Sequence, residues 1–249
     1  MLAPSADASA RRTLLAALAV TAVVAVILSL ANAARLSASL GDPDDALRLV
    51  MVRELLDGRG WYDQHLLRLQ PPLGVYMHWS RLVDGGLAGL DRLFRLGLPA
   101  DRAELAMRFV WPLLWIFPAV AAALSLARTL RPGAMLACAL LLATSLNLYV
   151  QFLPGRIDHH NVQIALSLVA VAAAVRGASA RDGIIAGGAT ALALAVGLES
   201  LPFLALAGAA TASPRQRLSP RASQAETPQR SGGVCSRKAP AAPRPSDRP

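Results

Sequence analysis

Cysteine is scarce in this sequence of 249 residues, which contains only Cys138 and Cys235. Cys138 lies within an apolar run and Cys235 within a polar C-terminal stretch, so we expect no structural disulfide between them. Neither cysteine lies in a pattern typical of a zinc site. The fold must therefore be stabilised in another way. The cysteines do not indicate whether the protein lies in an oxidising or a reducing compartment.

A basic binding face is also missing, although the formal net charge is +9 and the isoelectric point is near 11.0. Pro214–Pro249 contains eight basic residues and two acids, so this stretch alone carries +6. The remaining 213 residues carry only +3. Because the basic excess is concentrated in a tail, nucleic acid is not an expected partner.

The tail itself has almost no aliphatic residues and is rich in Pro, Arg, Ser, Ala and Gly. This composition predicts disorder over residues 214–249. The change from the preceding apolar sequence is abrupt, and the tail contains the only lysine of the chain, Lys238. We expect the chain to be a truncated or out-of-frame portion of a longer membrane protein.

Long apolar runs dominate the rest of the chain, which has 54% hydrophobic residues and a mean hydropathy of +0.43 overall. A membrane helix needs about 20 apolar residues to cross a hydrocarbon core of about 30 Å. The sequence therefore predicts an all-α fold, a polytopic transmembrane helix bundle of about five spans. These spans lie near residues 13–34, 109–127, 134–153, 158–175 and 183–211.

The first apolar run, residues 13–34, follows a short polar N-terminus that we expect to be disordered and cytoplasmic over residues 1–12. Ala31-Asn32-Ala33 resembles a signal-peptide cleavage site, so a cleaved signal peptide is the alternative. The run is longer than the usual apolar region of about 7–15 residues, and further spans follow it. An uncleaved first helix is the favoured interpretation.

Arginine placement predicts the topology. Pairs of arginine occur in every second connection, at Arg11 and Arg12, Arg128 and Arg131, and Arg176 and Arg181. Since positive residues favour the cytoplasmic side, the predicted protein is a multi-pass protein of the cytoplasmic membrane with its N-terminus inside. The loop of residues 35–108 and the stretch around Asp158 then both lie on the outer face.

Two amphipathic stretches occur in the predicted outer loop, from Asp44 to Leu56 and from Ser80 to Leu96. Apolar residues at helical spacing among charges predict two helices that lie on the membrane surface. A soluble loop folded on itself is the alternative. Pro71, Pro72 and Gly74 interrupt the chain between the two stretches.

The first cluster of chemistry-bearing residues places Asp42, Asp44 and Asp45 within four positions. Three neighbouring carboxylates repel one another unless a cation compensates them, and oxygen ligands suit Mg²⁺ or Mn²⁺. The alternative is helix capping, because Asp42 or Asp44 can cap the predicted helix that follows.

The second cluster is Asp158-His159-His160, at the mouth of the fourth predicted span. Charged groups there are costly unless paired, which makes them functional candidates. Residues i and i+2 diverge on a regular helix, so Asp158 and His160 can share an ion only from a turn, which Gly155 permits. The alternative is an interfacial cluster in which Asp158 caps the helix. Both acidic motifs can converge on one ion.

The order of these elements resembles the catalytic subunit of oligosaccharyltransferases, glycosyltransferases of the GT-C fold with polyprenyl-linked donors. Asp42 and Arg48 match the first acidic motif of that family, and Asp158-His159-His160 is similar to its Asp-x-His motif. Residues 71–84, with Pro71-Pro72, Gly74, Trp79 and Asp84, resemble a part of its first outer loop. The resemblance covers roughly residues 13–211.

The resemblance implies transfer of a sugar from a polyprenyl-phosphate-linked donor to an unknown acceptor at the outer membrane face. A divalent ion, Mn²⁺ or Mg²⁺, is implied to bind Asp42, Asp158 and His160 and to stabilise the departing phosphate charge. Asp42 and Asp158 are the implied catalytic residues. The candidates for phosphate contacts are Arg48, Arg81 and Arg156.

The resemblance is incomplete, because the later helices, the later acidic residue and the Trp-Trp-Asp acceptor motif of that family are not found. We therefore expect an N-terminal portion that is inactive by itself. Glu199 is a further intramembrane acid, either a ligand or a partner of a polar group. The alternative function is a non-catalytic integral membrane protein that binds an ion, a lipid headgroup or a partner subunit.

Overall fold

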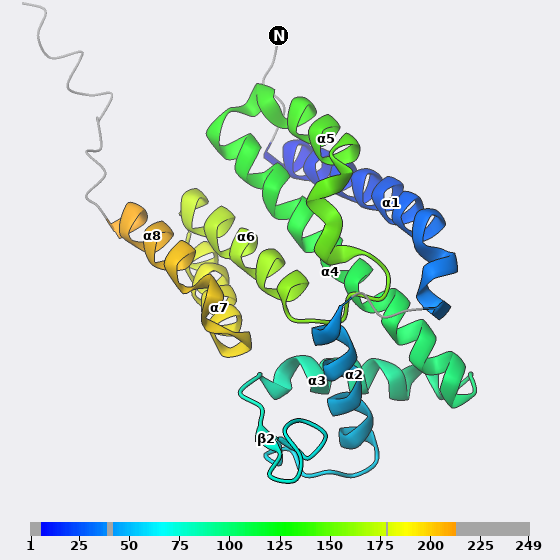
Figure 1. Ribbon diagram of the computed structural model, residues 1–249. Helices are drawn as coiled ribbons and strands as arrows, with labels where there is room; N and C mark the ends of the chain where they lie inside the picture. Colours follow the sequence, from blue (N-terminus) through cyan, green and yellow to red (C-terminus); the bar gives the residue numbers. More distant parts are fainter. Residues whose placement is uncertain (1–5, 39–41, 178, 213–249) are drawn as a thin grey trace, which may run out of the picture. The chain divides into compact units, whose positions relative to one another are not determined.

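The computed structural model describes residues 6–38, 42–177 and 179–212 (Figure 1). The tail over residues 214–249, predicted to be disordered, lies outside these residues. The described chain is mostly helical, as predicted. Its α-helices are α1 (Ala6–Ala38), α2 (Pro43–Leu56), α3 (Arg81–Phe94), α4 (Ala100–Leu130), α5 (Met135–Thr144), α6 (His160–Arg176), α7 (Ala180–Val196) and α8 (Leu201–Ala212).

Short elements connect these helices. The 3₁₀ helices are η1 (Pro132–Ala134), η2 (Leu146–Phe152) and η3 (Leu198–Ser200). Two strands, β1 (His65–Leu66) and β2 (Val75–Tyr76), form an antiparallel pair between α2 and α3. This pair was not predicted, since each strand has only two residues.

Among the residues that the structure describes, two helices are long and apolar enough to cross a membrane, the Ala8–Asn32 part of α1 and the whole of α4. The number becomes three when α5 and η2 are taken as one broken span, bent by 67°. Apolar side chains point outward on these helices and on α8, for example Leu30, Leu141 and Phe203. The predicted membrane character is supported, but five full-length spans are not confirmed.

The ends of the predicted spans differ from the helices observed. Helix α1 begins at Ala6, within the stretch expected to be disordered, and α4 begins at Ala100 instead of residue 109. The predicted span over residues 183–211 is two helices, α7 and α8. They separate at Gly197, whose backbone is extended, and Pro202 lies at the start of α8, where a missing N–H costs little.

Helix α4 packs against α1, α3, α5 and α6, and it links two hydrophobic cores (Figure 1). One core joins α1 to the C-terminal half of α4 and to η2. The other joins α2 and α3 to the N-terminal half of α4 and to α6, α7 and α8. The predicted outer loop is therefore anchored on the apolar helices by its own buried side chains.

The two amphipathic helices form where the sequence predicts them. Asp42 is the N-cap of α2, and its carboxylate accepts hydrogen bonds from the backbone of Asp44 and Asp45 at 3.0 and 3.1 Å. Ser80 is the N-cap of α3 and accepts from the backbone N–H of Leu82. Helix α3 buries Val83, Leu87 and Ala88 on one face, together with two acids, Asp84 and Asp91.

The contact between α3 and α4 gives a prediction at Gly86. A Cβ atom added there would lie 2.7 Å from the Trp111 ring, whereas one added at Gly89 of the same helix meets nothing within 4 Å. We expect Gly86→Ala to destabilise the protein by about 1–3 kcal/mol through overpacking. Gly89→Ala should be neutral or stabilising by about 0.5–1 kcal/mol. Thermal unfolding of the purified variants in one detergent measures both, and equal melting temperatures would contradict this packing.

Candidate functional site

The two acidic motifs of the sequence lie together. The Asp45 carboxylate at the first turn of α2 accepts hydrogen bonds from the backbone N–H groups of Ile157 and Asp158, at 2.8 and 3.0 Å. Asp45 is fully buried. Arg156 pairs with both Asp42 and Asp45 and donates to the side chain of Gln151 at 2.7 Å. The segment before α6 is thus attached to the start of α2.

A turn before α6 brings the second motif into one group. Gly155 has a φ of 98°, a left-handed conformation that side chains rarely adopt, and α6 begins only at His160. Because Asp158 precedes the helix, its Oδ2 lies 3.4 Å from His160 Nε2. The Oδ1 atom lies 2.6 Å from His159 Nδ1. The turn that Asp158 and His160 need in order to share one ion is therefore present.

Arg48 is the centre of a buried ion-pair network. Its guanidinium donates to Asp84 at 2.7 Å and to Asp158 at 3.2 Å, and only 1% of the residue is exposed. It also lies over the Trp79 ring, 4.5 Å from the centroid, which adds a cation–π contact. The second oxygen of Asp84 pairs with Arg81 at 3.1 Å. These contacts join α2, α3 and the segment before α6.

Burial and neighbouring charges displace the pKa values of Asp158, Asp45 and His159. Burial by itself would raise the pKa of Asp158, but His159 and Arg48 hold that pKa well below its ordinary value. Burial would lower the pKa of His159, yet Asp158 raises it. Burial raises the pKa of Asp45 to about 6, although Arg156 and two backbone N–H groups oppose the shift. Asp158 is therefore an anion at neutral pH.

Three residues form a group that can hold a metal ion, Asp158, His159 and His160. One ligand atom of each lies within 4.8 Å of the others. Asp158 Oδ2 and His160 Nε2 can both reach one ion at the contacts of about 2.0–2.1 Å that a small divalent cation needs. Carboxylate and imidazole donors suit Mn²⁺ or Zn²⁺. The residues present therefore fit a divalent cation.

Asp42, the third predicted ligand, does not belong to this group. Its carboxylate caps α2 and pairs with Arg156. The role of Asp42 as a ligand stays a prediction, while its role as a cap is observed. The three predicted phosphate-binding arginines are all engaged by carboxylates, Arg48 and Arg81 in buried pairs. Arg156 has the most exposed side chain of the three, at 13%.

The sequence placed Asp45 in the first acidic cluster and Trp79 and Asp84 in the stretch that resembles an outer loop, but it did not predict their contacts with Arg48, Arg156 or the turn before α6. A signal for Asp84 exists, since it occupies the apolar face of an amphipathic helix three residues after Arg81. Glu199 accepts a hydrogen bond from Gln163 at 2.7 Å, and its Oε1 lies 3.3 Å from His159 Nε2. Of the two alternatives for Glu199, the pairing with a polar group of a neighbouring helix is observed, with Gln163 of α6.

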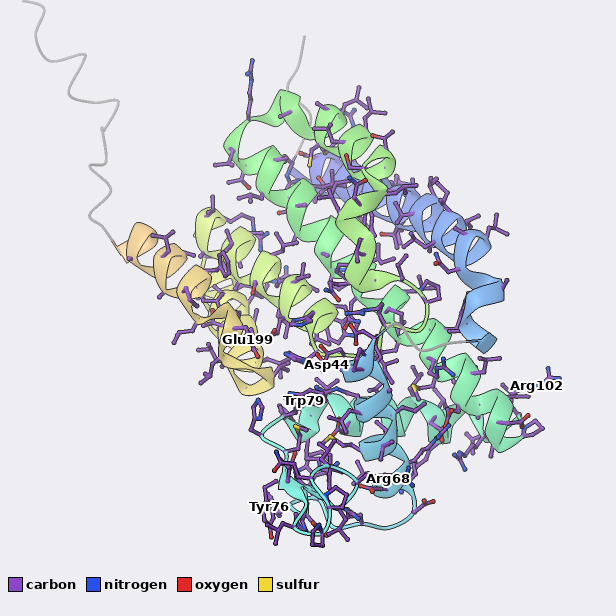
Figure 2. All side chains as sticks on the ribbon, viewed as in Figure 1. Asp44, Arg68, Tyr76, Trp79, Arg102 and Glu199 are labelled. Carbon is purple, nitrogen blue, oxygen red and sulfur yellow. The ribbon has the colours of Figure 1, made fainter. Side chains whose placement is uncertain are left out.

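A largely apolar cavity of about 420 Å³ begins at the metal-capable group. His160, Gln163 and Glu199 line its polar end, and the remaining walls come from α6 and α8. Figure 2 shows Glu199 at the lower end of the α7–α8 region, near Trp79, which precedes α3. The apolar lining residues are Ile164, Leu168, Val171 and Phe203.

Comparisons with protein-family models, with curated proteins and with solved structures find no match to this chain. Its functional interpretation therefore depends on the geometry of the site and on the resemblance of its motifs.

The buried ion pairs give a prediction at Asp84. Asp84→Asn removes the charge that compensates Arg48 and Arg81 in a fully buried position. Loss of one partner of a buried pair costs about 3–5 kcal/mol. Glu104→Gln is the matched control, because its partner Arg53 has a 56% exposed side chain, and exposed pairs contribute about 0–1 kcal/mol. Denaturant unfolding of both variants measures the difference, and similar losses would contradict the central role of this network.

Proposed function

We propose that this protein takes part in metal-assisted transfer of a sugar from a polyprenyl-phosphate-linked donor at the membrane surface. The observation that carries the proposal is that His160, a member of the group Asp158, His159 and His160, lines the polar end of an apolar cavity. A donor of this class has the same two parts, an anionic phosphate and a long apolar chain. The resemblance of the two acidic motifs to oligosaccharyltransferase catalytic subunits supports the same reaction.

The polar groups of the site are held by ion pairs. Three arginines, Arg48, Arg81 and Arg156, pair with four aspartates, and the Asp158 carboxylate also lies against His159 and His160. The four aspartates are Asp42, Asp45, Asp84 and Asp158. A divalent ion would bind Asp158 and His160 and supply Lewis-acid stabilisation of the phosphate charge. Arg48 holds Oδ1 of Asp158, which leaves Oδ2 directed toward His160.

The apolar cavity would hold the first part of the polyprenyl chain against α6 and α8. Its walls are branched and aromatic side chains, and burial of such a chain gains about 0.8 kcal/mol for each CH₂ group. Arg156, the more exposed arginine, is the candidate for a phosphate contact from the polar end. Asp158 and His160 orient the headgroup, and the lipid anchors it near the membrane surface.

A non-catalytic role is the second candidate, and one observation favours it. Arg48 already pairs with Asp158, so this carboxylate is compensated in part without any metal ion. In that case the polar residues would stabilise the attachment of the outer loop, and the cavity would bind a lipid without chemistry. A measurement of metal binding distinguishes metal-assisted sugar transfer from the non-catalytic role.

The metal site is tested by titrating Mn²⁺ into the purified full chain and following free Mn²⁺ by electron paramagnetic resonance. We expect one site in the wild type and a loss of affinity of about tenfold or more in His160→Ala, because each ligand contributes directly to the affinity. His65→Ala is the control, since His65 lies on β1 and contacts the Leu73 carbonyl. No saturable Mn²⁺ site in the wild type would leave only the non-catalytic role.

The Asp42→Ser variant distinguishes a role of Asp42 as a helix cap from a role of Asp42 in catalysis. Asp42→Ala should destabilise α2 by about 1 kcal/mol, whereas Asp42→Ser retains an N-cap and should restore most of this loss. If Asp42 also acts on substrate, Asp42→Ser stays folded but loses sugar transfer in a full-length protein. Thermal unfolding and transfer from a radiolabelled lipid donor measure the two effects. Wild-type transfer by the folded Asp42→Ser variant would restrict Asp42 to capping.

A further inference from the structure

A second cavity of about 420 Å³ lies on the His159 side of the metal-capable group. Its wall includes His78 and Trp79 from the segment before α3, His159, and Glu199 of η3. The wall is completed by Ser80, by Leu194, Ala195 and Val196 at the end of α7, and by Gly197 and Leu198. Glu199 lines both cavities, so the two meet at this carboxylate. Neither the metal nor the polyprenyl chain accounts for the second cavity.

The lining of this cavity combines an aromatic ring with hydrogen-bonding groups. Trp79 is partly buried and lines the cavity. The Arg48 guanidinium lies over the Trp79 ring. The Trp79 and His159 rings are 6.2 Å apart between centroids. The Glu199 side chain is 56% exposed, so its carboxylate can accept further hydrogen bonds. An anchored indole beside a carboxylate provides both apolar surface and polar contacts.

Space for the Glu199 carboxylate depends on Gly197. A Cβ atom at position 197 would collide with Glu199 Oε2 and would lie 2.6 Å from Gln163 Nε2. Because position 197 has no side chain, the hydrogen bond between Gln163 and Glu199 can form there. The carboxylate is therefore held in a fixed position at the boundary between the two cavities.

We infer that this second cavity binds the pyranose ring of the donor sugar, with Trp79 as the apolar platform and Glu199 as a hydroxyl acceptor. This inference rests on the proposed function. The cavity volume is near the lower end of the range of about 300–1,000 Å³ for small-molecule sites, which suits one sugar ring. The described residues that line it include neither arginine nor lysine, which disfavours a nucleotide or a second phosphate.

The test compares three probes with the full chain in nanodiscs by isothermal titration calorimetry with Mn²⁺ present. The probes are polyprenyl phosphate, the same lipid carrying a hexose, and the methyl hexoside, with glucose, mannose and galactose used in turn. We expect the sugar-bearing lipid to bind about tenfold more tightly than the sugar-free lipid for at least one hexose. The methyl hexoside alone should bind weakly, because the lipid part is missing. Binding of the methyl hexoside as tight as the sugar-bearing lipid would mark an acceptor site and overturn the donor assignment.

Two variants test whether the preference for the sugar-bearing lipid arises in the second cavity. Trp79→Leu removes the platform, and Ala195→Phe fills the cavity from α7 without a change to Arg48 or Trp79. Both should abolish the preference for the sugar, and Ala195→Phe, which lies outside the Arg48 network, should change the affinity for sugar-free lipid by less than about twofold. Tyr62→Leu is the control, because Tyr62 is 92% exposed in the same loop and lines neither cavity.

The outcomes distinguish this inference from the proposed function. If the wild type binds sugar-free lipid phosphate but the hexose adds nothing, the sugar subsite is wrong and the proposed function stands. The subsite is equally wrong if Ala195→Phe and Trp79→Leu both keep the preference for the hexose. If the wild type binds none of the lipid phosphates, the proposed function fails and the subsite fails with it.

Discussion

The buried guanidinium of Arg48 is the interaction on which the arrangement of this protein depends. A charge removed from water costs several kcal/mol unless it is paired and hydrogen-bonded. Trp79 and Asp84, at the start of α3, and Asp158, before α6, satisfy it from two other parts of the chain. Because each partner must stay in place to compensate the charge, α2, α3 and the segment before α6 are fixed relative to one another. The predicted outer loop is thereby attached to the apolar helices.

The same network gives the two oxygens of the Asp158 carboxylate different partners. Oδ1 contacts Arg48 and His159, while Oδ2 is directed toward His160. An anion held in this way is well suited to bind a cation, since its orientation is fixed and its proton is absent at neutral pH. Asp45 supports the arrangement by accepting two backbone hydrogen bonds from the turn that carries Asp158. The proposed metal site thus has its supporting residues in place.

Two cavities of similar volume meet at Glu199, one apolar and one lined by an aromatic ring and polar groups. A lipid-linked sugar has the same division, an apolar chain and a hydroxyl-rich ring joined through phosphate. The site would accordingly hold the chain along α6 and α8, the phosphate near His160 and the sugar beside Trp79. This placement follows from the chemistry of the lining residues. The break at Gly197 leaves room for Glu199, which lines both cavities, and the turn at Gly155 precedes Asp158, His159 and His160.

Local signals in the sequence predict the helical fold class, the membrane character and the two amphipathic helices, and they allow a cap at Asp42 or Asp44 and a turn at Gly155. These features depend on residues within a few positions of each other, so spacing and composition predict them. Two features could not be predicted from the sequence and are seen only in the tertiary structure. They are the partners of Arg48, which lie 36 and 110 residues away, and the separation of α7 from α8. The tertiary structure also decided that Asp42 pairs with Arg156 and that Trp79 borders a cavity. Charge pairing between distant segments depends on how helices pack, and no periodicity along one chain encodes that choice.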